Sequence, residues 1–498
     1  MTAIEGQSRT ATEEAPTDAP PTWPPREEAD ETAGEAPSRP ARAPAPITER
    51  DAAAQAPAPP LTQEDLGLDR AFLDGLVLKT LYTSGALSGD GLAEALDVPF
   101  WSFDTSLLSF QRRKLAEVIR SQGMGRRGYT FELTTEGRRR ARELMESERY
   151  VGPAPVPLER YRYWIARQSV RHTQIHPKKV RDALEHLVLD PRTVELLGPA
   201  INASRSIFLY GEAGNGKTTI SEAVVEIFGD HIYIPRAVYA DGHVIQLFDL
   251  TVHNPAGVRG GAGSQADAIV HPAPELDDRF VEIERPMVMT GGELTFDQLE
   301  LQYDRRSGAY QAPPHMRANG GVFVIDDFGR QRVPPRELLN RWMIPLDRGV
   351  DYLSFASGRR AAIPFDCVVI FATNLNPSDL IEEAFFRRIR YKIKIGSPER
   401  AHYEEIFRRV CETMEIPYRR EAVDWIYREY YERHGIEPRA CHPGDILTDL
   451  FDLAVYHGED PALSQRMLRQ ACASYFMDAP TRRGNRNGNA NGEKRNGI

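Results

Sequence analysis

The sequence predicts an α/β protein built on a doubly wound parallel sheet. Three short apolar runs lead to this expectation, SIFLY at 206–210, VFVID at 322–326 and VVIFATN at 368–374. Because each run is followed by a helical pattern, the three read as buried strands of βα units within residues 177–397. From 398 to 478 the apolar residues recur at helical spacing, which predicts a helical lid domain that starts at Ser397-Pro398.

Residues 63–150 predict a separate N-terminal domain. Helical spacing recurs over three runs, at 70–82, 90–97 and 105–122. A β-like stretch with a glycine-rich tip follows at 123–134, and the next helix runs from Thr135 to about Glu148. Three helices, a basic hairpin and another helix is the order of a winged-helix domain.

The two ends of the chain differ in composition from the rest. Residues 1–60 hold twelve of the 37 prolines, so we expect a disordered arm over 1–62. Residues 479–498 carry a polar, basic run and are expected to form a disordered tail. The proline-rich start of 151–176 predicts a connector between the N-terminal domain and the sheet domain.

The formal net charge of −10 on the 498 residues averages unlike segments. Residues 1–60 contribute −6, residues 481–498 contribute +4, and residues 105–142 alone carry +7. That basic block holds Arg112, Arg113, Lys114, Arg120, Arg126 and Arg127. An acidic total therefore does not exclude nucleic acid, although the block would also suit docking on the acidic remainder of the chain.

Composition excludes several classes of protein. Hydrophobic residues make up 41%, which argues against a fully disordered chain, and four cysteines are too few for a disulfide scaffold. No run approaches the ~18 apolar residues of a membrane span, and the N-terminus lacks a secretory signal. Cys441-His442 lacks further ligands at metal-binding spacing. We expect a soluble, cytoplasmic protein without a membrane partner.

The segment SIFLYGEAGNGKTT, residues 206–219, fits the P-loop pattern GxxxxGK[ST]. Glycines leave room for backbone N–H groups to point into one concavity, and the helix that follows presents its N-terminus to a phosphate. Lys217 would reach the β- and γ-phosphates of ATP, and Thr218 would bind Mg²⁺. The residues expected to hold the nucleotide are Gly211, Glu212, Ala213, Gly214, Asn215, Gly216, Lys217, Thr218 and Thr219.

Polar residues end the next two strands. Asp326 would hold the Mg²⁺ shell, and Asp327 would orient or activate the attacking water. Asn374, at the end of the third run, is placed to bind the γ-phosphate and position that water.

Three arginines supply candidate cations. Arg387 and Arg388 follow the third strand, and Arg439 precedes a predicted helix. A cation that enters a phosphoryl-transfer site from outside accelerates the reaction by ~10³–10⁵-fold. The alternative is that these arginines cover a solvated surface.

These elements, in this order, resemble an AAA+ ATPase over residues 180–478. The resemblance identifies Gly211–Thr219 as Walker A, Val322–Asp327 as Walker B and Asn374 as sensor 1. It places Arg387 and Arg388 at the arginine-finger position and Arg439 at sensor 2. It implies Mg²⁺-dependent ATP hydrolysis in a ring, usually a homo-hexamer, whose arginine fingers act between subunits. The two strands expected around Ser357-Gly358 are similar to the hairpin that precedes sensor 1 in the MoxR-like branch.

The chain departs from that family at two points. AAA+ proteins usually carry Asp-Glu at Walker B, whereas this chain has Asp326-Asp327. The side chain of Asp327 is one methylene shorter than that of the usual glutamate. In addition, Asp326 lies 109 positions after Lys217. The excess includes Gly257–Gly263, expected to be a mobile loop, and the block 285–304. Within 254–320 we expect an insertion that either touches the substrate or elaborates the surface.

Three functions remain open at this stage. The first is an ATPase that remodels a protein partner, chaperone-like. The second is a DNA-associated ATPase that binds duplex through residues 105–142. The third is a nucleotide-dependent switch with slow turnover, suggested by the shorter Asp327.

Overall fold

The computed structural model describes residues 56–121, 125–203, 206–256, 276–380 and 389–476. The expectations for most of the N-terminal arm, for the tail and for Gly257–Gly263 lie outside these residues, as do Arg387 and Arg388. The last part of the arm is described and is not free. The carbonyl of Pro57 accepts from the Asp277 backbone N–H at 2.9 Å, and Arg160 donates to the carbonyl of Ala58 at 2.6 Å.

A five-stranded parallel sheet carries the three predicted strands. Its order is β10 (Met287–Thr290), β13 (Val322–Ile325), β16 (Val368–Thr373), β5 (Ile207–Tyr210) and β17 (Tyr391–Lys394). Every neighbouring pair is parallel, so the predicted parallel sheet is confirmed. Strand β16 follows β13 in the chain but also pairs with β5, so it lies between the first two predicted strands.

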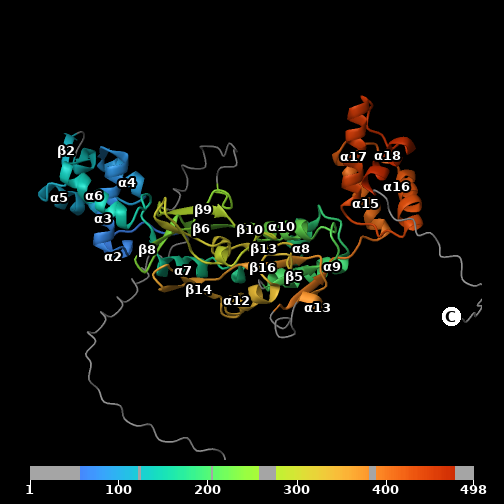
Figure 1. Ribbon diagram of the computed structural model, residues 1–498, viewed down its shortest axis with the longest axis horizontal. Coiled ribbons are helices and arrows are strands. Elements are labelled where there is room, and N and C mark those ends of the chain that lie inside the picture. Colours follow the sequence, from blue (N-terminus) through green and yellow to red (C-terminus); the bar gives the residue numbers. More distant parts are fainter. Residues whose placement is uncertain (1–55, 122–124, 204–205, 257–275, 381–388, 477–498) are drawn as a thin grey trace, which may run out of the picture. The chain divides into compact units, whose positions relative to one another are not determined.

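Helices cover both faces of this sheet, because side chains alternate between them (Figure 1). Val322 and Val324 belong to the core formed with helices α8 (Pro177–Leu184), α9 (Pro191–Asn202) and α10 (Lys217–Phe228). Phe323 belongs to the opposite core with helix α12 (Pro335–Arg348), where its ring meets Trp342 edge-on. The apolar runs are continuous because both faces of each strand are buried.

The long interval before Asp326 builds further sheets. Strands β6 (His231–Pro235) and β9 (Phe280–Glu284) pair antiparallel. A mixed sheet has the order β11 (Gln302–Asp304), β12 (Ala309–Gln311), β8 (His243–Gln246), β7 (Ala237–Ala240) and β4 (Val156–Pro157). The block 285–304 was expected to be excess, but it contains β10, an edge strand of the main sheet. That expectation was wrong because β10 is only four residues long, and a run so short does not identify a strand in the sequence.

Residues 151–176 do more than connect two domains. Helix α7 (Leu158–Arg167) begins directly after β4 and buries Tyr161, Trp164 and Ile165. The hydroxyl of Tyr161 accepts from Asn319 at 2.9 Å. Helix α7 is therefore part of the hydrophobic core that it forms with residues of β6 to β9.

The N-terminal region folds as helices around a three-stranded antiparallel sheet of order β1-β3-β2. Its elements are α2 (Gln63–Leu66), α3 (Arg70–Ser84), β1 (Leu87–Ser88), α4 (Gly89–Leu96), α5 (Trp101–Arg112), β2 (Ala116–Ser121), β3 (Tyr129–Leu133) and α6 (Thr135–Ser147).

The helix expected over 105–122 is wrong in its second half. Helix α5 ends at Arg112, Lys114 takes a left-handed φ of 57°, and the chain continues as β2 paired with β3. Val118 and Ile119 fit a helical arc in sequence, but their β-branched side chains favour a strand once a partner strand is present.

A β-hairpin precedes β16 in the chain. Strands β14 (Val350–Ser354) and β15 (Arg360–Pro364) pair antiparallel around Ser357-Gly358, as expected from the sequence. Gly358 has a φ of 80°, the left-handed conformation that such a turn requires. The short helices α11 (Pro314–Arg317) and α13 (Pro377–Leu380) lie before β13 and after β16 in the chain.

The C-terminal region is helical, with its own core. Its helices are α15 (Arg400–Thr413), α16 (Arg420–Ile426), which continues as a π-helical turn over Tyr427–Glu432, α17 (His442–His457) and α18 (Gln465–Tyr475). The predicted start at Ser397-Pro398 is wrong, because α15 begins at Arg400 after Glu399. The Ser397 hydroxyl donates to Glu437 at 3.3 Å instead of capping the helix.

All four cysteines are free thiols, and Cys367, Cys411 and Cys472 are buried. Among the described residues, no group of three or more His, Cys, Asp or Glu side chains is arranged to hold a metal ion by itself. No helix in the described part of the chain is both long and apolar enough to cross a membrane.

Candidate functional site

The P-loop forms a concave turn between β5 and α10. Gly214 and Gly216 both have a φ of 83°, and Gly211 has a φ of 145°, conformations that residues with a Cβ rarely adopt. At Gly211 a Cβ would also lie 2.0 Å from the carbonyl oxygen of Ile395. The glycines are therefore required by the backbone path, which ends at the N-terminus of α10.

Lys217 is held across the mouth of this turn. Its Nζ donates to the carbonyls of Gly211 at 3.0 Å and Glu212 at 2.9 Å, and to the side-chain oxygen of Asn374. Burial lowers the pKa of Lys217, and the nearby carboxylates of Asp326 and Asp327 partly oppose that shift. The ammonium group is thus oriented and partly desolvated, which strengthens its attraction for an anion.

Thr218 and Asp326 bring two oxygen ligands together. The Thr218 hydroxyl donates to Oδ2 of Asp326 at 2.8 Å, although the two residues lie 108 positions apart in the chain. Mg²⁺ in phosphate sites typically takes one or two protein oxygens and completes its shell with phosphate and water. Thr218 and Asp326 would therefore be suitable oxygen ligands for Mg²⁺.

Asn374 joins the lysine to the second acidic residue. Its Nδ2 donates to Oδ1 of Asp327 at 2.9 Å, while its Oδ1 accepts from Lys217. This chain of contacts exists because β16 lies between β5 and β13, so all three side chains emerge at the carboxyl edge of the sheet. Ligands of open α/β sheets bind at that edge.

Asp327 adopts a left-handed backbone conformation, with a φ of 48°. That conformation costs a non-glycine residue about 1–2 kcal/mol. It turns the chain sharply after β13, and the Asp327 carboxylate meets Asn374 there. Residues in such conformations persist where the surroundings hold them, and they cluster at functional sites.

The three residues that precede α17 contact the P-loop. Arg439 forms an ion pair with Glu212 at 3.0 Å, the Ala440 N–H donates to Oδ1 of Asn215 at 3.2 Å, and the Cys441 N–H donates to the carbonyl of Gly214 at 2.9 Å. Arg439, expected near the nucleotide, therefore lies beside the loop. A movement of α17 would therefore act directly on the P-loop backbone through these contacts.

A cavity of about 680 Å³ extends from these groups. Its polar lining includes Lys217, Thr218, Asp326, Asp327 and Asn374. Its apolar lining includes Leu187, Val188, Leu189, Ile406 and Val410, and Arg409 and Thr413 join it from the same helix as the last two. A cavity with both kinds of lining suits a ligand that has a charged part and a flat, less polar part.

Comparison with known proteins gives a partial match. Residues 399–474 match the model of a domain of unknown function (DUF8689). No curated protein matches the chain.

Solved structures similar to the chain include forms of RuvB from Thermotoga maritima. Two RuvB mutants have TM-scores of 0.35 and 0.34 at 13% and 15% identity; they cover 59% and 62% of this chain and 73% and 74% of their own. The RuvB Holliday junction branch migration motor has a TM-score of 0.31 at 14% identity, covering 62% of this chain and 74% of its own.

The structure brings together most of the predicted site residues. Lys217, Thr218, Asp326, Asp327 and Asn374 all line the cavity, as do Ala213, Gly214, Asn215, Gly216 and Thr219. Gly211 and Glu212 contact Lys217 through their carbonyls. The expectation for Arg387 and Arg388 lies outside the described residues.

Sequence reasoning missed two contributors. Gln331 lies five positions after Asp326 and binds the turn that carries both carboxylates; nothing in the local pattern distinguishes it from a surface glutamine. The strip Leu187–Leu189 contributes apolar lining to the cavity. It lies about thirty residues before Lys217, and nothing in the neighbouring sequence indicates that it belongs to the site.

Proposed function

We propose that the chain is an AAA+-type ATPase that binds ATP with Mg²⁺, hydrolyses it and uses the cycle to remodel a protein partner. The observation that carries the proposal is the continuous set of contacts Lys217–Asn374–Asp327 beside Thr218–Asp326. It combines a cation for phosphate, two oxygen ligands for a metal ion and a carboxylate for water within one cavity. Phosphoryl transfer depends on this kind of positioning and charge stabilisation.

Each residue has a distinct role in this proposal. The backbone N–H groups of the P-loop and the Lys217 ammonium group bind the phosphate oxygens. Thr218 and Asp326 hold Mg²⁺, which neutralises charge on the phosphates when bound. Asp327 accepts a proton from, or orients, the attacking water, while Asn374 fixes the position of the Asp327 carboxylate. The apolar strip at Leu187–Leu189 takes the base.

The activity is tested by phosphate release from the purified full-length protein with ATP and Mg²⁺. We expect hydrolysis in the natural protein, its loss in Lys217→Ala and a slow residual rate in Asp327→Asn. Only the lysine variant should also lose nucleotide binding, measured with a fluorescent ATP analogue. Tight binding without phosphate release in the natural protein would instead support the slow switch.

Remodelling of a protein partner would use the helical C-terminal region. Helices α15 to α18 would form the lid. Residues 439–441, which precede α17, contact the P-loop and would transmit movements between the nucleotide site and the lid. Asp327→Asn should slow hydrolysis and hold a client in the ATP-bound form. Capture on this variant with ATP, compared with capture on Lys217→Ala, should enrich protein; recovery of nucleic acid alone would contradict the remodelling role.

We also propose a homo-hexameric ring in which Arg387 or Arg388 completes the neighbouring subunit's site. Mixing Arg388→Ala protein with Lys217→Ala protein should then recover part of the hydrolysis that each lacks. Absence of recovery at every mixing ratio would argue against fingers acting between subunits.

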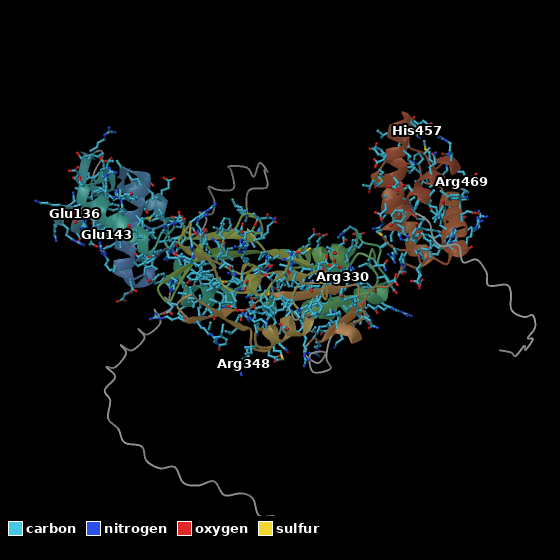
Figure 2. The ribbon with its side chains drawn as sticks, viewed as in Figure 1. Glu136, Glu143, Arg330, Arg348, His457 and Arg469 are labelled. Atoms are coloured by element: carbon cyan, nitrogen blue, oxygen red, sulfur yellow. The ribbon has the colours of Figure 1, made fainter. Side chains whose placement is uncertain are left out.

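Duplex DNA is the second candidate partner, through a winged helix formed by α3 to α6. The ion pairs of the basic block narrow the candidate surface. Arg126 pairs with Asp104 and Arg127 with Asp90. On α6, Glu136 and Glu143 (Figure 2) pair with Arg139, and Glu143 also pairs with Arg140. Within the described residues, the basic side chains of this block that form no ion pair are Arg112, Arg113, Lys114, Arg120 and Arg142.

The exposed run Arg112–Lys114 is therefore the preferred phosphate contact in this second proposal. Mobility shifts of duplex DNA by the full-length protein at low salt should weaken when all three residues are changed to alanine. The matched control changes Arg138, Arg139 and Arg140, whose charges are already paired. Absence of binding by the natural protein at low salt would reject the DNA role, since phosphate contacts are strongest there.

A further inference from the structure

Gln331 is bonded to the turn that follows β13. Its Nε2 donates to the carbonyl of Asp326 at 2.9 Å and to that of Asp327 at 3.2 Å. Its Oε1 accepts from the Gly329 N–H at 2.8 Å, and a longer contact of 3.4 Å joins Nε2 to the carbonyl of Gly291 after β10. Gln331 is only 8% exposed, so these bonds are made away from bulk water.

Two of the groups that Gln331 bonds are the carbonyls of Asp326 and Asp327, which stand on either side of the Asp327 backbone torsions, and further bonds are made in the same turn. The Asp327 N–H donates to the Asp326 carboxylate at 2.9 Å, and its carbonyl accepts from the Arg330 N–H at 2.9 Å. Arg330, labelled in Figure 2, lies in the same loop and is exposed. Gln331 adds the only side-chain amide among the described residues that reaches the carbonyls of both aspartates. A left-handed aspartate needs such external support.

We propose that Gln331 is a positioning residue for hydrolysis, an inference that rests on the ATPase function proposed above. By bonding both carbonyls, it keeps Asp327 in the left-handed conformation that directs its carboxylate to Asn374. This support compensates for the short side chain of Asp327: the carboxylate is set by the turn of the backbone. Gln331 does not itself line the cavity.

The test separates positioning from simple stabilisation. Gln331→Met keeps the length and apolar volume of the side chain but removes every hydrogen bond that the side-chain amide makes. Gln331→Glu keeps an oxygen for the Gly329 N–H but places a second oxygen against the carbonyls of Asp326 and Asp327. The matched control is Gln168→Met, because Gln168 also bonds backbone groups, the N–H and the carbonyl of Tyr233, at 2.6 and 2.9 Å.

We expect Gln331→Met and Gln331→Glu to lower kcat about a hundredfold, since small misplacements of a reacting group cost that much. The dissociation constant of a fluorescent ATP analogue should change less than about twofold, because the phosphate and base contacts remain. Gln168→Met should lower the thermal midpoint without lowering kcat. In an Asp327→Asn background, Gln331→Met should cause no further loss, because both changes act on one group.

An unchanged kcat in the Gln331 variants would overturn the inference, as would a parallel loss of kcat and nucleotide affinity. If the natural protein releases no phosphate, the proposed function fails, and the inference is then judged by structure. A crystal structure of Gln331→Met should show Asp327 out of its left-handed conformation and away from Asn374. An unmoved Asp327 would overturn the inference whether or not the protein hydrolyses ATP.

Discussion

Asn374 donates to the Asp327 carboxylate at 2.9 Å, although the two residues lie 47 positions apart in the chain. The same amide accepts from Lys217, so one uncharged side chain links the cation and the carboxylate of the site. A direct contact between Lys217 and Asp327 would neutralise both groups. With the amide between them, each charge remains directed towards the cavity.

Asn374→Ala should therefore separate hydrolysis from binding. Removal of the amide takes away the side-chain hydrogen bond that the Asp327 carboxylate accepts among the described residues, and we expect kcat to fall roughly a hundredfold. Nucleotide affinity should fall much less, because the P-loop contacts persist. Steady-state kinetics and analogue titration measure the two effects. As a control, Asn319→Ala removes a buried amide that bonds Tyr161 and Pro364 instead, and it should lower stability rather than kcat.

Two adjacent threonines make a matched pair for the metal site. Thr218 donates to Asp326, whereas Thr219 is exposed. Thr218→Ala should raise the Mg²⁺ concentration that gives half-maximal hydrolysis by about tenfold or more. Thr218→Ser should restore it, because the hydroxyl returns. Thr219→Ala should leave the Mg²⁺ dependence unchanged; an equal shift in both alanine variants would contradict the assignment.

Gly214 and Gly216 share a φ of 83° but differ in surroundings. A Cβ on Gly214 would lie 2.5 Å from Sγ of Cys441, whereas none of the described atoms lies within 4 Å of a Cβ on Gly216. Both alanine variants bear the left-handed cost of about 1–2 kcal/mol, and Gly214→Ala adds a clash. Cys441→Ala should raise the thermal midpoint of Gly214→Ala but not that of Gly216→Ala. Equal rescue of both would show that α17 does not pack on the loop in this way.

His442 predicts a specific pH dependence. Burial, and then the charge of Arg439, lowers the pKa of His442 to about 4, while Asp445 partly opposes this. Its Nδ1 contacts the Tyr431 hydroxyl at 2.9 Å and the Arg439 N–H at 3.2 Å, and the Tyr475 ring packs against the imidazole. The unfolded chain, with an ordinary histidine pKa of about 6.5, therefore binds the proton more readily than the folded one.

The free energy of unfolding should consequently fall as the pH drops from about 6.5 to 4, by up to about 1.4 kcal/mol per pH unit from this group. Above pH 6.5 the group should have no effect. His442→Asn keeps an acceptor near the position of Nδ1 but does not titrate. Urea unfolding at pH 7, 6 and 5 should show a shallower slope for this variant; identical slopes would contradict the assignment.

The parts of the fold that were predicted are those with a local signal. Continuous apolar runs indicated β5, β13 and β16 because strands buried on both faces need no polar alternation. Where the local signal was ambiguous, prediction failed. Residues 105–122 fit a helical arc, yet β3 supplies hydrogen bonds that draw residues 116–121 into a strand. Strand β10 is four residues long, and only its pairing with β13 shows that it is a strand.

Local chemistry in the chain was enough to specify the phosphate turn, its lysine and the acidic pair, since glycine spacing and strand ends are read from neighbouring residues. Long-range packing specified the rest. Insertion of β16 between β5 and β13 placed Asn374 between Lys217 and Asp327. The turn after β13 gave Asp327 its left-handed conformation and Gln331 its partners. Such contacts depend on strand order and on the burial of both sheet faces, which no short stretch of sequence encodes.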